Sequence, residues 1–162
     1  MEAQPREKLQ RAATDKGGNI WLTGGLVGKM AFQGGELDSG VVQDNRDMLI
    51  MKLGSEGNWI WGKQFGDAQN PQDFFGVKVD EEGNGVVVGS YVGSVELGEN
   101  LFVHQNPSMR ENRILAKFDD ATGEVKWAKN FPCNGMCESS SKVFIDSVGQ
   151  IVVAGKIKMM PS

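Results

Sequence analysis

The apolar residues of this chain fall into short runs that are closed by Gly, Asp or Asn, a pattern typical of β-strands joined by tight turns. Some runs are apolar throughout, such as VVV at 86–88 and IVVA at 151–154, and this predicts strands that are covered on both faces. Other runs alternate with polar residues, such as GVKV at 76–79, and this predicts strands with one face in water. The pattern therefore predicts an all-β fold with strands at 9–14, 20–26, 48–53, 58–65, 74–79, 85–92, 113–118, 124–131, 143–145 and 151–157.

One acidic turn followed by an apolar run recurs three times, as DKGGNIWLTGG from Asp15, DEEGNGVVVGS from Asp80 and DSVGQIVVAGK from Asp146. The copies are 65 and 66 residues apart, since 80 − 15 = 65 and 146 − 80 = 66. A glycine closes the apolar run in each copy: Gly24, Gly89 and Gly155. Self-similarity at a fixed period indicates a repeat architecture such as a solenoid, a propeller or an array.

A second block repeats in step with the first, because DMLIMKLGSEGNWIWGKQF at 47–65 aligns with NRILAKFDDATGEVKWAKNF at 112–131, with one extra residue in the turn of the second copy. Each repeat then holds two hairpins, which predicts a four-stranded antiparallel sheet. Such a sheet, with buried inner strands and a more solvated outer strand, is typical of a β-propeller blade. We therefore expect an N-terminal tail at 1–8 and, over 9–162, a partial β-propeller of about two and a half blades.

The stretches VDEEGNGVVVGSYVGSVELGENLFV at 79–103 and ENRILAKFDDATGEVKWAKNF at 111–131 resemble the seven-bladed-propeller-type β-propeller repeats, the SBBP family. The pattern of that family is Asp-x-x-Gly-Asn, an apolar strand ending in Thr-Gly or similar, a glycine-rich excursion, Asp-x-Phe-x-x-Lys-Leu and Gly-x-x-x-Trp. The resemblance runs from Leu9 to Ile157 and implies a β-propeller fold. The chain departs from the pattern in three places: Gln150, Asn112 and FPCNGMC at 131–137.

The tryptophans divide into two pairs. Trp61 and Trp127 occupy the same place in two repeats, so packing between blades is favoured over a platform for stacking sugars. The segment around Trp127 is also similar to the tryptophan-docking motif of quinoprotein-type propellers, which implies the same packing role. Trp21 and Trp59 have no aromatic counterpart in the second repeat, which makes them the better candidates for function, although burial is still the favoured interpretation.

Composition and charge limit the choice of partner. Hydrophobic residues make up 40% of the chain and charged residues 23%, which is typical of a globular protein. The formal net charge is −4 and no block of Lys or Arg stands out, so we expect neither nucleic acid nor an anionic membrane surface as a partner. No apolar run approaches the roughly 18 residues of a membrane helix, and no signal peptide is visible at the N-terminus. The localisation stays open, with an extracellular or cell-surface parent protein among the options.

Few residues have the chemistry of a metal or redox site. Cys133 and Cys137 flank Asn-Gly-Met, and both a local disulfide and two free thiols fit this spacing. With His104 as the only histidine, no zinc ligand set is expected. The acidic turns at 80–84 and 119–124 suggest calcium, but they lack the Asp-x-Asp-x-Asp-Gly spacing, so solvated turns are favoured and no metal or cofactor is expected.

No nucleophile elbow, phosphate-binding loop or His-containing zinc motif occurs in the sequence, so no catalytic residues are predicted. The favoured hypothesis is a non-enzymatic β-propeller repeat module that serves as a structural or binding scaffold for protein or glycan partners. The alternative is a piece of a larger propeller enzyme, quinoprotein-like or polysaccharide-active, whose catalytic residues lie outside this chain. An open set of blades exposes apolar faces, so we also expect association with another chain or with further blades of a longer protein.

Overall fold

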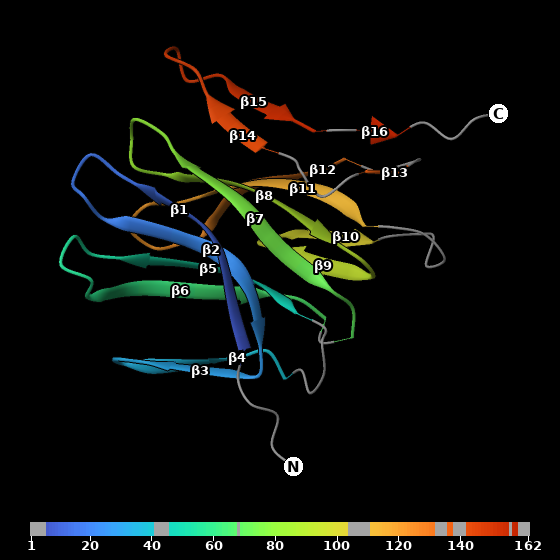
Figure 1. Cartoon of the computed structure of the whole chain (residues 1–162), viewed down its shortest axis with the longest axis horizontal. Helices are drawn as coiled ribbons and strands as arrows, with labels where there is room; N and C mark the ends of the chain where they lie inside the picture. Colours follow the sequence, from blue (N-terminus) through green and yellow to red (C-terminus); the bar gives the residue numbers. More distant parts are fainter. Residues whose placement is uncertain are drawn as a thin grey trace.

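The computed structural model describes residues 6–40, 46–67, 69–103, 111–131, 136–137, 142–155 and 157–158. The regular secondary structure in these ranges consists of β-strands (Figure 1). The described residues contain no helix that is long and apolar enough to cross a membrane. Two four-stranded antiparallel sheets form the body of the molecule. Sheet I has the order β1 (Arg6–Thr14), β2 (Ile20–Val27), β5 (Asp47–Leu53), β6 (Trp59–Phe65). Sheet II has the order β12 (Val125–Phe131), β11 (Asn112–Phe118), β8 (Gly85–Tyr91), β7 (Gln72–Val79).

Smaller antiparallel hairpins and one short strand pair complete the described part of the chain. They are β3 (Lys29–Phe32) with β4 (Gly35–Asp38), β9 (Ser94–Leu97) with β10 (Asn100–Val103), β14 (Lys142–Ile145) with β15 (Ile151–Ala154), and β13 (Met136–Cys137) with β16 (Ile157–Lys158). The hairpins β3–β4 and β9–β10 lie in the two glycine-rich segments that follow β2 and β8, called the excursions below. They occupy equivalent places, since 94 − 29 = 65 and 100 − 35 = 65.

The all-β class is confirmed, and each predicted strand has a counterpart. Two bounds differ. β1 begins at Arg6 rather than at 9, and β15 ends at Ala154, after which Ile157–Lys158 pairs with β13 instead of continuing the strand. No strand was predicted in the excursions, but each of them contains a hairpin with a glycine of positive φ in its turn, Gly34 and Gly98.

The three acidic turns have one geometry. The Asp15 carboxylate accepts hydrogen bonds from the backbone N–H groups of Gly17 (2.8 Å) and Asn19 (2.9 Å), and the carboxylates of Asp80 and Asp146 each accept the same two bonds in their own turns. The fourth residue of each turn has positive φ and is glycine, as that conformation favours: Gly18, Gly83 and Gly149. Each aspartate therefore satisfies turn N–H groups that the ladder leaves free. Gln150 keeps the backbone bond, so its departure from the family pattern does not disturb the turn.

Sheets I and II pack face to face around the largest apolar core. Sheet I contributes Trp21, Met48, Ile50 and Trp61, and sheet II contributes Phe74, Val77, Val87, Tyr91, Ile114, Ala116 and Phe118. The other face of sheet II packs against the β14–β15 hairpin through Val86, Val88, Leu115 and Val143. Alternate residues of β8 therefore enter different cores, which explains why VVV at 86–88 is apolar throughout.

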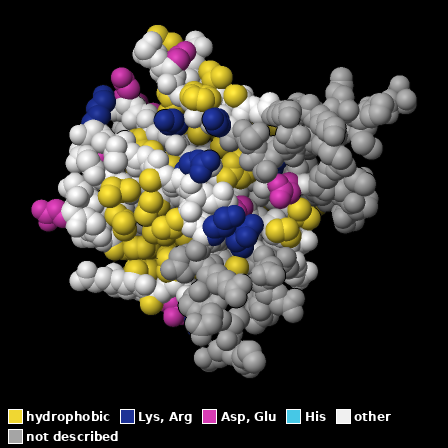
Figure 2. Space-filling model, in the orientation of Figure 1, with side chains coloured by type: hydrophobic (Ala, Val, Ile, Leu, Met, Phe, Trp, Pro, Cys, Tyr) yellow, Lys and Arg dark blue, Asp and Glu magenta, His cyan; other side chains and the backbone are white. Residues whose placement is uncertain are grey.

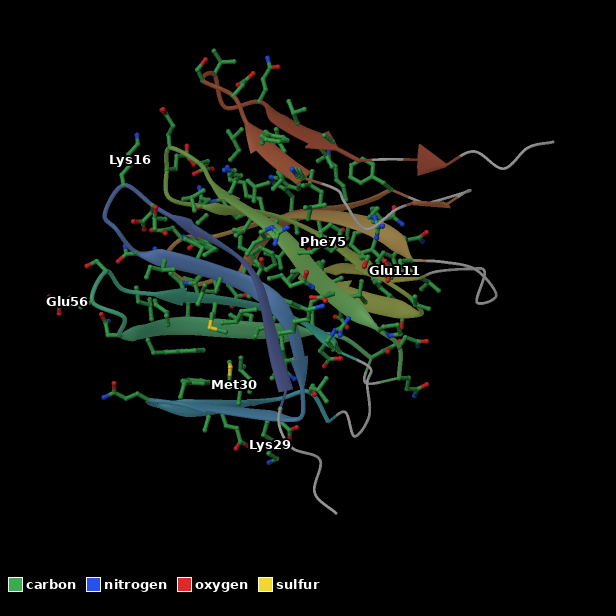
Figure 3. All side chains as sticks on the ribbon, in the orientation of Figure 1. Lys16, Lys29, Met30, Glu56, Phe75 and Glu111 are labelled. Carbon is green, nitrogen blue, oxygen red and sulfur yellow. The ribbon has the colours of Figure 1, made fainter. Side chains whose placement is uncertain are left out.

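Within the described residues, the other face of sheet I is covered by the β3–β4 hairpin. Its core holds Leu26, Leu49 and Met51, with Leu22, Met30, Leu37 and Trp59 partly buried around them. Figure 3 shows Met30 on the side of β3 that faces sheet I, while Lys29 points away from it. The molecule is thus a stack of sheet faces in the order β3–β4, sheet I, sheet II, β14–β15 (Figure 1).

Candidate functional site in a groove between β1, β7 and β14

The repeated charged residues hold the sheets together. Lys52 of sheet I lies with its Nζ 3.3 Å from Asp15 Oδ2, and Lys117 of sheet II lies 2.6 Å from Asp80 Oδ2. Lys52 also pairs with Asp120, which belongs to the turn between β11 and β12 of the neighbouring sheet. Burial by itself would raise the pKa of Asp15, but the hydrogen bonds from Asn19 and Lys52 outweigh it and hold that pKa below the ordinary value. These ion pairs belong to the scaffold.

Trp61 and Trp127 take equivalent places on edge strands, each opposite the repeated lysine of the neighbouring strand. Trp61 is only 8% exposed, and its Nε1–H donates a hydrogen bond of 3.0 Å to the backbone carbonyl of Asp120. Trp127 is half-buried against the core of β14–β15, with the Lys129 ammonium 6.0 Å from its ring centre. The two differ because the β11–β12 turn covers Trp61, and no equivalent turn covers Trp127 within the described residues. The buried Trp61 ring cannot stack on a sugar.

The other two tryptophans also pack within the protein. Trp21 is fully buried and meets Trp61 edge-on, with ring centres 4.9 Å apart. Trp59 stacks on Phe32 of the β3–β4 hairpin at 3.8 Å with an interplanar angle of 9°. Trp59 therefore lies on the outer face of sheet I, where it is half-buried, and Trp21 is no longer a candidate for contact with a ligand.

The repeated glycines allow close approach between strands. A Cβ on Gly24 would lie 2.0 Å from the carbonyl oxygen of Lys8, and one on Gly89 would lie 2.5 Å from that of Asp73. Both glycines therefore have a steric reason to lack a side chain. Gly155, the third copy, directly follows β15 and is exposed.

The sulfur and histidine positions singled out in the sequence lie beyond what the structure describes. Cys133 and His104 are outside the described residues, and Cys137 lies in β13 without a described side chain, so the disulfide stays a prediction. Among the described residues, no group of three or more His, Cys, Asp or Glu side chains is placed to hold a metal ion.

A groove runs where β1, β7 and β14 lie side by side. It consists of two adjoining hollows of ≈ 400 Å³ and ≈ 250 Å³ that share Gln10 and Phe75. Both of these residues sit on a β-bulge, because the pairing register shifts between Leu9 and Arg11 and again between Phe74 and Gly76. Bulges re-aim side chains and are frequent beside functional sites. Figure 3 shows Phe75 in the middle of this face of the molecule.

A buried carboxylate forms part of the wall of the smaller hollow. Oδ2 of Asp73 accepts a hydrogen bond of 2.5 Å from Gln10 Nε2 and lies 3.4 Å from Arg46 Nε. Oδ1 of Asp73 is buried and finds no hydrogen-bond donor among the described residues. Burial raises the pKa of Asp73 to about 6, although the nearby charge of Arg46 acts in the opposite direction. Asp73 is therefore a buried acceptor with one free oxygen beside a groove.

Basic residues that are far apart in the sequence lie together along the groove. Six Lys and Arg side chains in the described part of the chain form no ion pair with a described residue: Lys8, Arg11, Lys16, Lys78, Lys129 and Lys142. Four of them line the groove, namely Lys8, Arg11, Lys78 and Lys142. The sequence analysis did not find this basic cluster, because its members lie far apart along the chain.

The polar and aromatic residues of the groove, unlike the scaffold residues, do not repeat, whereas Val77 recurs as Val143, 66 residues on. Counting 65 residues on, Lys8 corresponds to Asp73, Gln10 to Phe75, and Ala13 to Lys78. Asp15 and Lys52, in contrast, recur as Asp80 and Lys117. A position that differs between units with the same fold is not required by that fold. This difference was visible in the sequence and is the signal by which the groove could have been found.

Comparison of the chain with protein-family models and with curated proteins gives no match. The fold and the groove therefore define the class: an all-β protein of stacked antiparallel sheets, built on an internal repeat and carrying a basic groove across its units.

Proposed function

We propose that this chain is a non-enzymatic repeat module of the β-propeller type, which serves as a structural and binding scaffold for protein or glycan partners. The observation that carries the proposal is that one kind of interface is built twice from equivalent residues. Trp61 enters the core between sheets I and II, and Trp127 enters the core between sheet II and β14–β15. Successive four-stranded sheets packed through such a repeated interface are what the blades of a propeller require.

The outer face of sheet I supports this proposal. Leu22, Leu49 and Met51 occupy the places that Val87, Ile114 and Ala116 occupy in sheet II, counting 65 residues on. On sheet II this face is covered by the whole of sheet I. On sheet I the only described element that covers this face is one hairpin, whose Met30 and Leu37 stay partly exposed. The face therefore has the composition of a surface that receives a further sheet.

The opposite end of the stack is also apolar. Phe144 of β14 is 47% exposed and Val152 of β15 is 50% exposed. β15 pairs only with β14 within the described residues, so its other edge offers free backbone groups. β2 and β8, its counterparts in sheets I and II, are both covered at that edge, by β5 and β11. This end is therefore suited to pairing with strands of a further unit.

Light scattering across a micromolar concentration series tests the assembly. We expect the chain to associate, and we expect Val152→Glu to weaken that association by placing a charge on the exposed end. Val148→Glu is the matched control, since Val148 is 75% exposed in the turn of the same hairpin but lies outside the β14–β15 pairing. A wild-type monomer that unfolds cooperatively, or equal effects of the two substitutions, would contradict the proposal.

For the alternative, a piece of a larger propeller enzyme whose catalytic residues lie outside this chain, the groove supplies few carboxylates. Only Asp73 and Glu111 line it among the described residues. Each of them is paired with an arginine, Asp73 with Arg46 and Glu111 with Arg113. These two paired carboxylates do not favour the alternative, and the interface that is built twice from equivalent residues is what supports the scaffold.

A further inference from the structure

The groove has a charge opposite to that of the whole chain. The formal net charge of the chain is −4. The basic residues that line the groove are Lys8, Arg11, Arg46, Lys78 and Lys142, and the acidic ones among the described residues are Asp73 and Glu111. Figure 2 shows Lys and Arg side chains gathered in the middle of the face that Figure 1 assigns to β1 and β7. Since both acids are already paired with arginines, the unpaired cations dominate the local field, and such a field attracts an anion.

The remaining groove residues indicate what the anion is attached to. Gln10 and Phe75, which the bulges direct into both hollows, supply an amide and an aromatic ring, and Phe144 adds a second ring. Oδ1 of Asp73 is a buried acceptor that lacks a donor. Aromatic faces, an amide and a free carboxylate oxygen together suit a ring that bears hydroxyl groups, because each hydroxyl can donate and its C–H face can pack on an aromatic ring.

The size of the groove favours a small ligand over a polymer. The hollow of ≈ 400 Å³ lies near the lower end of the range of small-molecule sites, about 300–1,000 Å³, and the adjoining hollow of ≈ 250 Å³ lies below it. A long polyanion would extend beyond the groove over the surface of a chain that is acidic as a whole, which would oppose its binding. An acidic peptide would gain little from the aromatic rings and the free acceptor.

We infer that the groove between β1, β7 and β14 binds a small saccharide anion, a sugar that bears a carboxylate or a phosphate group. Arg11, Lys78 and Lys142 hold the anionic group, while Gln10 and Asp73 contact the hydroxyl groups. This inference deepens the glycan part of the proposed function and rests on it only to that extent. The binding assay measures the heat of ligand binding and the assembly assay measures molecular mass, so failure of one is distinguishable from failure of the other.

Isothermal titration calorimetry with the full chain tests the inference. The probes are glucuronate, glucose 6-phosphate, glucose and inorganic phosphate, and the first two distinguish a carboxylate from a phosphate. We expect one of the sugar anions to bind at least about tenfold more tightly than glucose and than inorganic phosphate, and we expect added salt to weaken binding because the charges are partly exposed. Equal affinity for inorganic phosphate would reduce the groove to a general anion site and overturn the inference.

Substitutions locate the site. Lys142→Gln and Lys78→Gln should each weaken binding of the sugar anion about threefold, the effect of one exposed charge. Lys16→Gln is the matched control, because Lys16 also forms no ion pair with a described residue but lies at the tip of the β1–β2 turn, away from the groove (Figure 3). A loss with Lys16→Gln as large as with Lys142→Gln would overturn the inference. So would tighter binding of a hexaglutamate peptide than of either sugar anion, which would assign the groove to acidic peptides.

Discussion

Truncation of the two equivalent tryptophans should destabilise the protein unequally. Trp61→Ala removes a ring that is 8% exposed, edge-on to Trp21, and bonded through its N–H to the carbonyl of Asp120. Trp127→Ala removes a ring in the equivalent register that is only half-buried, without a hydrogen bond from its indole N–H to a described residue. The chemistry of the change is identical, so any difference reports the surroundings of the two rings.

The magnitudes follow from burial. Removing a buried Trp side chain costs about 3–5 kcal/mol, and the lost hydrogen bond, about 1 kcal/mol, puts Trp61→Ala at the upper end of that range. For the half-buried Trp127 we expect about 2 kcal/mol, because roughly half of the apolar contact is lost. Trp61→Phe should fall between them at about 2–3 kcal/mol, since a ring remains in the core while the donor is removed.

Urea unfolding followed by circular dichroism measures these losses as shifts of the midpoint at an unchanged slope. All variants are compared at one protein concentration, because assembly changes the apparent stability. Equal losses for Trp61→Ala and Trp127→Ala, or a larger loss for Trp127→Ala, would refute the idea that the β11–β12 turn secures one ring and leaves the other open.

Three further outcomes are expected. Lys52→Met should lower the free energy of unfolding by about 3–5 kcal/mol, because removal of this buried ammonium leaves two carboxylates without their ion pair. Lys117 pairs with one carboxylate, so Lys117→Met should cost less than half as much in the same urea assay. The pKa of Asp73 is about 6 in the folded state and 3.8 in the unfolded state. Relative to Asp73→Asn, the wild type should therefore lose about 2–3 kcal/mol of stability as the pH rises from about 4 to 7. A stability difference between the two proteins that does not change with pH would contradict the burial of Asp73. Gly24→Ala should unfold or severely destabilise the chain, as judged by its melting temperature, since the new methyl group would overlap the backbone carbonyl of Lys8.

The sequence was sufficient for the strands and their turns because both depend on local chemistry. The aspartate at the start of each turn and the glycine at its fourth place report backbone requirements that neighbours along the chain satisfy. The excursions were harder. The segment at 29–38 is too short and too polar to read as strands, and it becomes a hairpin because Met30 and Leu37 find an apolar sheet face to pack against.

Contacts between sheets could not be predicted, because they depend on how the sheets stack. The pairing of Lys52 with Asp120 joins residues 68 positions apart, and nothing near either residue indicates the other. Trp21 was a candidate for function because its counterpart is Val86. Both positions enter a core, but a different core in each sheet, and a core can be filled by residues of different size.

The groove lies where residues are not repeated between the units, and its position in the fold explains why. Along most strands of this fold, a side chain enters one of two cores, and the identity of the residue is fixed by packing on that side. β1, β7 and β14 are different because they lie at the edges of their sheets and approach one another there. Residues that face this meeting line contact several units at once and are free of the requirement to match a counterpart. A basic residue, an amide or an aromatic ring can therefore be placed in one unit without being repeated in the next, and that freedom is what a ligand site needs in a protein built from copies.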